Sequence, residues 1–173
     1  MTIKSERSEN IDWDLLGLYM NDHVAGATAG IARVTRMAQA YRDTPHAQML
    51  TAMAKEFREE RQFYYDLLDR FGLGRRTCRQ LLAWTGEKVG RAKLNGALIG
   101  TSPMTPVFES ELLRAAVLGK IGGWESLTAY REELAIPAGK LEGLIEQARR
   151  QIDELSTMHQ DFRATAFRAE RSG

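Results

Sequence analysis

Apolar residues recur every three or four positions along four long stretches of this chain, a spacing typical of amphipathic α-helices that bury one face. We expect helices over about residues 10–42, 45–72, 105–131 and 138–168. The alternating Val, Ile and Thr runs that indicate strands are missing from the sequence. The pattern therefore predicts an all-α fold, with residues 1–173 forming a single helical domain.

Turn and capping residues separate these stretches. Thr44 and Pro45 stand between the first two helices, where a side-chain cap and a residue without a backbone N–H suit a helix start. Gly72 ends the second helix and Pro137 precedes the last. A shorter amphipathic stretch over about 78–94 predicts an additional short helix between the second and third long ones.

The lengths of the connections predict a topology. The first and second helices, and the third and fourth, are joined by short turns, so each pair should be antiparallel. The link from Arg75 to Pro103 is long enough to run back along the whole second helix. We therefore predict an up-down-down-up bundle with one crossover.

Charge and cysteine content narrow the class of protein. Lys and Arg total 24 against 23 Asp and Glu, so the chain as a whole has no field that attracts nucleic acid or acidic membranes. The lone Cys78 cannot form an internal disulfide, which agrees with a reducing compartment. No stretch resembles a secretory signal or a membrane span. We expect a cytoplasmic protein without a membrane partner.

Helix order, helix lengths and the crossover resemble the ferritin-like superfamily. The runs Leu18–Gly30 (LYMNDHVAGATAG) and Glu87–Gly96 (EKVGRAKLNG), followed by Ser102-Pro103, are similar to uncharacterised bacterial proteins of that superfamily. The resemblance implies a dinuclear metal site made from carboxylates and Glu-x-x-His motifs on four inward helices. This chain departs from that pattern, because Phe63 follows Glu60 at the position of the histidine. We therefore expect a degenerate di-iron site and no cofactor.

Four polar residues fall on the predicted apolar faces. His23 and Glu60 should lie at a similar height on antiparallel helices, and we predict that they approach each other as a satisfied core polar pair. Lys120 is a further possible partner of Glu60. His159 should lie roughly 12 Å from His23 along the bundle axis, too far for a shared metal shell. A lone metal, a small ligand, or catalysis at Glu60 remain alternatives, and His46 is expected to be exposed.

Small residues cluster on the first and third long helices, where each internal glycine weakens a helix. Gly26 and Gly30 on one helix, with Gly119, Gly122 and Gly123 on the other, predict a close approach of two backbones. A cavity that accepts a ligand, or a contact with another subunit, would also explain them.

The short helix in the crossover is strongly basic. Lys88, Arg91 and Lys93 are its candidate anion-binding residues. No aromatic stacking platform accompanies them, so a solvated face is the preferred interpretation and nucleic acid is not the expected partner.

Three hypotheses follow from these patterns. The first is a non-catalytic structural or interaction protein that forms a homodimer. The second is a metal-binding or iron-handling oxidase with an atypical ligand set around Glu60, involving His23 with Glu111 or His159. The third is anion or nucleic-acid binding through the basic helix. Enzymatic activity is less expected than its absence.

Overall fold

A computed structural model describes residues 7–75 and 102–168, which form four α-helices and contain no strand. The helices are α1 (Trp13–Ala40), α2 (Ala47–Arg70), α4 (Thr105–Thr128) and α5 (Lys140–Ala166). The all-helical prediction is confirmed for these residues, and each helix lies inside the range expected from its periodicity. The short helix expected over 78–94 falls outside the described residues.

The turns explain where the helices begin and end. The Asp12 carboxylate caps α1 by accepting from the backbone N–H of Leu15 at 3.0 Å. The expected cap of α2 by the Thr44 side chain does not form. Its hydroxyl donates to the Tyr41 carbonyl at 2.7 Å and accepts from His46 N–H, so it stabilises the turn and α2 begins after it. Gly139, at a φ of 80°, provides the left-handed residue before α5.

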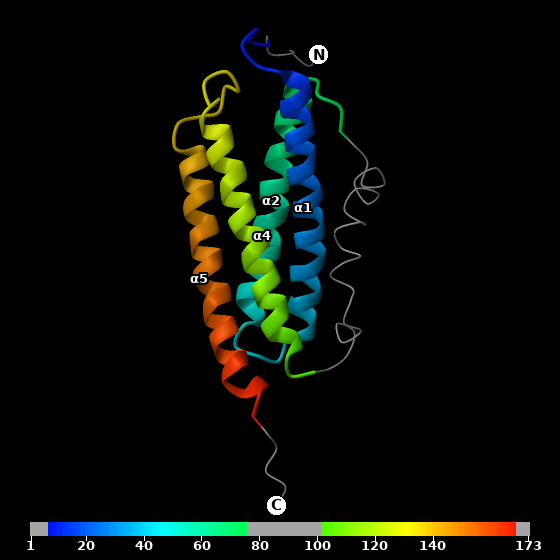
Figure 1. Cartoon of the computed structure of the whole chain (residues 1–173), viewed down its shortest axis with the longest axis vertical. Helices are drawn as coiled ribbons and strands as arrows, with labels where there is room; N and C mark the ends of the chain where they lie inside the picture. The colour runs from blue at the N-terminus through cyan, green and yellow to red at the C-terminus, as the bar shows by residue number, and fades with distance from the viewer. Residues whose placement is uncertain (1–6, 76–101, 169–173) are drawn as a thin grey trace, which may run out of the picture.

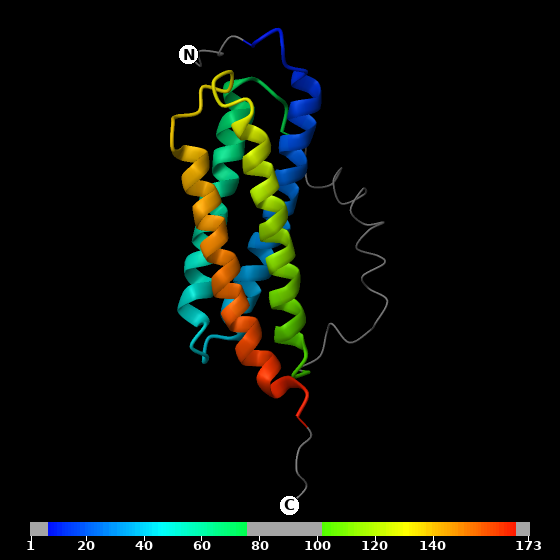
Figure 2. The same cartoon turned by 60° about the vertical axis from the view of Figure 1, so that its left-hand side comes forward.

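The four helices form an elongated bundle (Figure 1). Helices α1 and α5 descend in this view, whereas α2 and α4 both rise. Helix α1 packs on α2 and α4, and α5 packs on α4 and α2. The turned view shows α4 and α5 as a pair in front of α1 and α2 (Figure 2). Helix α4 is therefore the diagonal neighbour of α2.

The apolar core is divided along the bundle axis. One cluster surrounds Tyr64 and Trp124, and the other surrounds Phe57 and Leu113. On α2 the two clusters are separated by Glu60, which is only 3% exposed. A charged residue thus lies at the waist of the bundle, between two apolar halves.

Across residues 7–75 and 102–168, no helix combines the length and apolar character needed to cross a bilayer.

Candidate functional site

Glu60 is the only acidic side chain that is buried among the described residues. Its Oε2 accepts from the Nζ of Lys120 at 2.7 Å. Its Oε1 accepts from the amide of Gln147 at 2.7 Å and from that of Gln151 at 3.2 Å. A buried carboxylate is costly unless it is paired and hydrogen-bonded, and here both oxygens have donors.

The network continues from the waist to the surface through Gln151, whose side chain is wholly buried. Its Oε1 accepts from Lys120 at 2.5 Å, and its amide also donates to Glu56 at 2.7 Å. Glu56 in turn pairs with Arg150. Helices α2, α4 and α5 are therefore joined by one chain of charge-assisted hydrogen bonds.

Lys120 is the cation of this network. Its Nζ lies 4.1 Å from the centroid of the Phe57 ring, and its side chain is 14% exposed. Burial lowers the pKa of Lys120, and the attraction of Glu60 opposes that shift. Lys120 had been expected only as a further possible partner of Glu60, but its ammonium is the charged group in contact with the carboxylate.

The side chains at the waist do not fit a dinuclear metal centre. Such a centre needs several carboxylate or imidazole ligands converging on two hard cations. At the waist, Glu60 is held by an ammonium and two neutral amides. Nowhere in the described part of the chain do three His, Cys, Asp or Glu side chains gather closely enough to hold a metal ion.

His23 lies among aromatic rings. Its ring meets Tyr19 edge-on, with centroids 4.6 Å apart, and lies nearly parallel to Tyr64 at 5.6 Å. Burial lowers the pKa of His23 and the nearby Asp22 opposes the shift, so the imidazole is neutral at neutral pH. His23 and Glu60 line the same cavity. The hydrogen bonds of Glu60 go to Lys120 and the two glutamines, because a full positive charge and amide donors serve a carboxylate better than a neutral ring.

The other histidines lie toward the opposite end of the bundle. His159 Nε2 is 2.9 Å from Glu111 Oε1, which brings together two residues considered for an atypical metal site, but away from Glu60. His46 was expected to be exposed, and this is wrong. Its side chain is only 12% exposed, because the ring packs near Phe162 and pairs with Asp161. The candidate anion-binding residues Lys88, Arg91 and Lys93 lie outside the described residues.

A cavity of about 350 Å³ opens between α1, α2 and α4, and Glu60 and Lys120 are among the residues that line it. Gly26 and Ala27 contribute one side and Ala116 and Gly119 the other. A Cβ atom added at Gly26 or Gly119 would meet nothing within 4 Å. The prediction that these glycines bring two backbones together is therefore wrong, and they border open space instead.

Gly123 is a different case. A Cβ atom there would lie 2.6 Å from both the Tyr64 hydroxyl and the His23 ring. The missing side chain at this position lets two polar aromatic groups reach the backbone of α4. Its close contact is with side chains, and not with the backbone of α1.

Two buried hydrogen-bond donors belong to residues that line the cavity and are unused among the described residues. Tyr64 stacks on Trp124, with ring centroids 4.5 Å apart, and both residues line the cavity. The Tyr64 hydroxyl and the Trp124 indole nitrogen are buried and have no hydrogen-bond partner among the described residues. Buried Tyr and Trp usually find a partner, so two neighbouring exceptions in one cavity need an explanation. The periodicity placed Trp124 on a buried face but gave no signal of missing partners.

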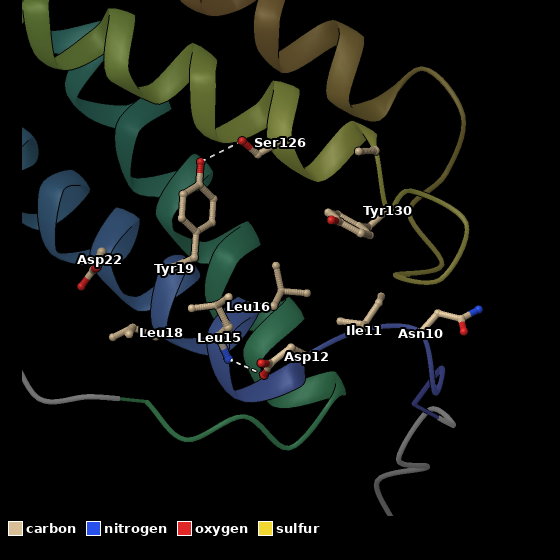
Figure 3. Close-up of a pocket in the computed structure, with 11 residues that line it drawn as sticks. Asn10, Ile11, Asp12, Leu15, Leu16, Leu18, Tyr19, Asp22, Ser126 and Tyr130 are labelled. Atoms are coloured by element: carbon tan, nitrogen blue, oxygen red, sulfur yellow. Dashed lines mark hydrogen bonds between the residues drawn. The ribbon is translucent and has the colours of Figure 1, made fainter.

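A larger groove of about 630 Å³ lies at one end of the same α1–α4 face (Figure 3). It is lined by apolar residues such as Leu15 and by Tyr130, and the Tyr19 hydroxyl donates to Ser126 across it at 2.9 Å. Tyr19 and Asp22 line both hollows, so the groove adjoins the cavity. No buried charged side chain faces the groove, and the polar chemistry is concentrated in the smaller cavity.

Comparisons with protein-family models, with curated proteins and with solved structures find no match to this chain.

Proposed function

We propose that this chain is a ferritin-like four-helix bundle that lacks a complete dinuclear metal site and acts as a non-catalytic structural or interaction protein. The shared direction of α2 and α4 in Figure 1, together with the long connection between them, supports the ferritin-like relationship. The short helix expected in that connection is part of the same proposal.

The observation that carries this proposal is the contact between Lys120 and Glu60. The ammonium lies 2.7 Å from the carboxylate, at the waist, where a metal ion would need the same oxygen. The two remaining hydrogen bonds to Glu60 come from neutral amides. Their N–H groups donate hydrogen bonds to the carboxylate, and they carry no negative charge that would balance a metal ion. The positive charge beside Glu60 is thus supplied by a side chain, and the described residues at the waist offer no ligand set for two hard cations.

Metal analysis tests the proposal directly. The purified chain is incubated aerobically with ferrous iron, desalted, and its metal content is measured by elemental analysis. We expect far less than one ion per chain, with the same result for Glu60→Ala. Stoichiometric metal in the native chain that is lost in Glu60→Ala would overturn the proposal in favour of an iron-handling protein.

The interaction part of the proposal rests on exposed apolar side chains. Leu112 is 45% exposed and Leu118 63% exposed on α4, which suits burial against a second copy of the chain. We propose a homodimer formed through a long helix face. Light scattering should give about twice the 19.5 kDa of one chain. Leu118→Glu should shift the mass toward that of the monomer, and a monomeric native chain would rule the dimer out.

The cellular location is also a proposal. The single Cys78 suits a reducing compartment, and we propose that the protein is cytoplasmic.

A further inference from the structure

The side of the bundle between α1 and α4 presents exposed apolar surface. Both hollows lie on this α1–α4 face, which is lined by Leu15, Asp22 and Gly26 from α1 and by Ala116 and Tyr130 from α4. Leu15 is 63% exposed and Tyr130 is 42% exposed. The outer surface of a helix in a bundle is normally polar, so exposed apolar residues on two neighbouring helices indicate that something covers them.

The outer surface of α4 shows this most clearly. On α5, exposed positions include charged residues such as Glu146, Arg149 and Asp153. Between residues 112 and 124 of α4, by contrast, every exposed position is apolar. These positions are Leu112, Ala115, Ala116, Leu118 and Gly119. A helix that is apolar on all sides is usually enclosed by other elements.

The connection from α2 to α4 has to pass this face. The two helices are diagonal neighbours and both rise in Figure 1, so the chain that joins them runs the length of the bundle over either α1 or α5. Its first described residues lie on α1, because the Gly74 carbonyl accepts from the Asn21 amide at 3.0 Å. The connection therefore sets out over α1, and it reaches α4 at Ser102, at the opposite end of the bundle.

Residues 76–101 make up this connection outside the described part of the chain, and their sequence suits the face in length and polarity. Helix α4, with 24 residues, is about 36 Å long. The helix predicted over about 78–94 would account for about 25 Å of that length. Apolar residues recur in it at helical spacing, which would place them on one side. They are Cys78, Leu81, Leu82, Val89 and Ala92.

The charges of the face and of the connection are complementary. Asp12 and Asp22 line the groove at the end where the connection sets out, and no described Lys or Arg lines it. The connection contains one acid, Glu87, among several basic residues. The basic residues are Arg76, Arg79, Lys88, Arg91 and Lys93. Complementary charges of this kind favour one orientation of two surfaces over others.

We infer that the α1–α4 face is an intramolecular docking surface and that residues 76–101 of the same chain occupy it. Apolar side chains of the connection cover Leu15, Gly26 and Ala116, and its basic side chains lie toward Asp12 and Asp22. This inference goes beyond the proposed function and does not depend on it. Leu118 projects from α4 about 100° away from its neighbour in the sequence that lines the cavity, so it is left for the proposed dimer.

Photo-cross-linking of the full chain identifies what covers the face. Cys78 is the only cysteine, so Cys78→Ser gives a background in which one introduced cysteine is labelled with benzophenone maleimide. Gly26→Cys and Ala116→Cys place the label on the face from α1 and from α4. Gly143→Cys on α5 and Ala52→Cys on α2 are the matched controls, because both positions are exposed and line neither hollow.

After illumination, denaturing gels separate cross-links within one chain from those between chains, and mass spectrometry maps the cross-linked peptides. We expect both labels on the face to attach to residues 76–101 of their own chain, and neither control label to do so. Cross-links that join two chains at these positions would show that a second copy covers the face and would overturn the inference. Cross-links confined to the four helices would overturn it as well.

Weakening the docked segment provides a second test. In the Ala116→Cys chain, replacing both Leu81 and Leu82 by Asn should raise the rate of alkylation by N-ethylmaleimide at least about tenfold, because the loss of two apolar contacts releases the segment. Gln80→Asn, a polar change in the same segment, is the control and should leave the rate unchanged. Circular dichroism checks that each variant is folded, and Val89→Asn replaces the double change if that variant unfolds. An unchanged rate in a folded variant without these apolar residues would refute the docking.

Discussion

Removing one partner of the buried ion pair between Glu60 and Lys120 should destabilise the bundle. Replacing Lys120 by Met keeps a long unbranched side chain but leaves the Glu60 carboxylate, 3% exposed, with only the two glutamine amides. Breaking a buried ion pair by removing one partner costs about 3–5 kcal/mol. We expect the lower end, about 3 kcal/mol, because amide donors remain on Glu60 and Lys120 itself retains some contact with solvent.

The reciprocal change, Glu60→Met, should have a similar cost. It leaves the Lys120 ammonium beside the Phe57 ring, with Gln151 as its remaining hydrogen-bond partner. If the two charges act as a unit, the double variant should lose no more than about 3 kcal/mol, whereas independent effects would add to about 6 kcal/mol. The coupling free energy between the two positions is then about 3 kcal/mol.

Urea unfolding of the native chain, both single variants and the double variant, followed by circular dichroism, measures these free energies. Unchanged m-values would show that the compactness of the states has not changed. A double variant as unstable as the sum of the singles would refute the description of Glu60 and Lys120 as one unit. A loss below about 1 kcal/mol in Lys120→Met would show that the pair behaves as an exposed one.

Three further predictions concern stability. Gly119→Ala should raise the free energy of unfolding in urea by up to about 1 kcal/mol, because the added Cβ atom meets open space. Gly123→Ala should lower it by about 1–2 kcal/mol, because the added Cβ atom clashes with Tyr64. Effects of equal sign would contradict this packing. Burial lowers the pKa of His23 below 6.5, so the unfolded chain binds the proton first and the free energy of unfolding should fall as the pH drops below 6.5. His23→Phe should lose that part of the pH dependence. Parallel curves of unfolding free energy against pH for the native chain and the variant would contradict this prediction. Asn21→Leu should lower the thermal midpoint, at a cost of about 1–2 kcal/mol, because the Gly74 carbonyl loses its buried amide donor; an unchanged midpoint would show that this bond adds nothing.

The helices could be predicted from the sequence because their signal is local. Apolar spacing and turn residues are properties of short segments, and the ranges they predicted contain all four long helices of the structure. The burial of Glu60 was predicted in the same way, because its neighbours on the helical face, Phe57 and Tyr64, are large and apolar.

The details of the site depend on distances between helices, which local spacing does not contain. Lys120 is placed beside Glu60 by the rotation of α4 relative to α2 and α5, and nothing in either helix alone gives that rotation. For the same reason, Gly26 and Gly119 gave no indication of whether they border a backbone contact or a cavity. The unused donors of Tyr64 and Trp124 result from what the neighbouring helices fail to supply.

The buried network at the waist also determines how the helices can slide past one another. A shift of α5 by one turn, about 5.4 Å, would bring Leu155 or Gln147 to the place of Gln151. With Leu155 there, Glu60 and Lys120 would each lose a hydrogen-bonding partner. Leu, Met and Phe contacts tolerate such slippage, but a carboxylate with fixed donors does not. The hydrogen bonds of Glu60 therefore fix the register of the helices, because they favour one alignment among several nearly equivalent ways of packing the same apolar faces.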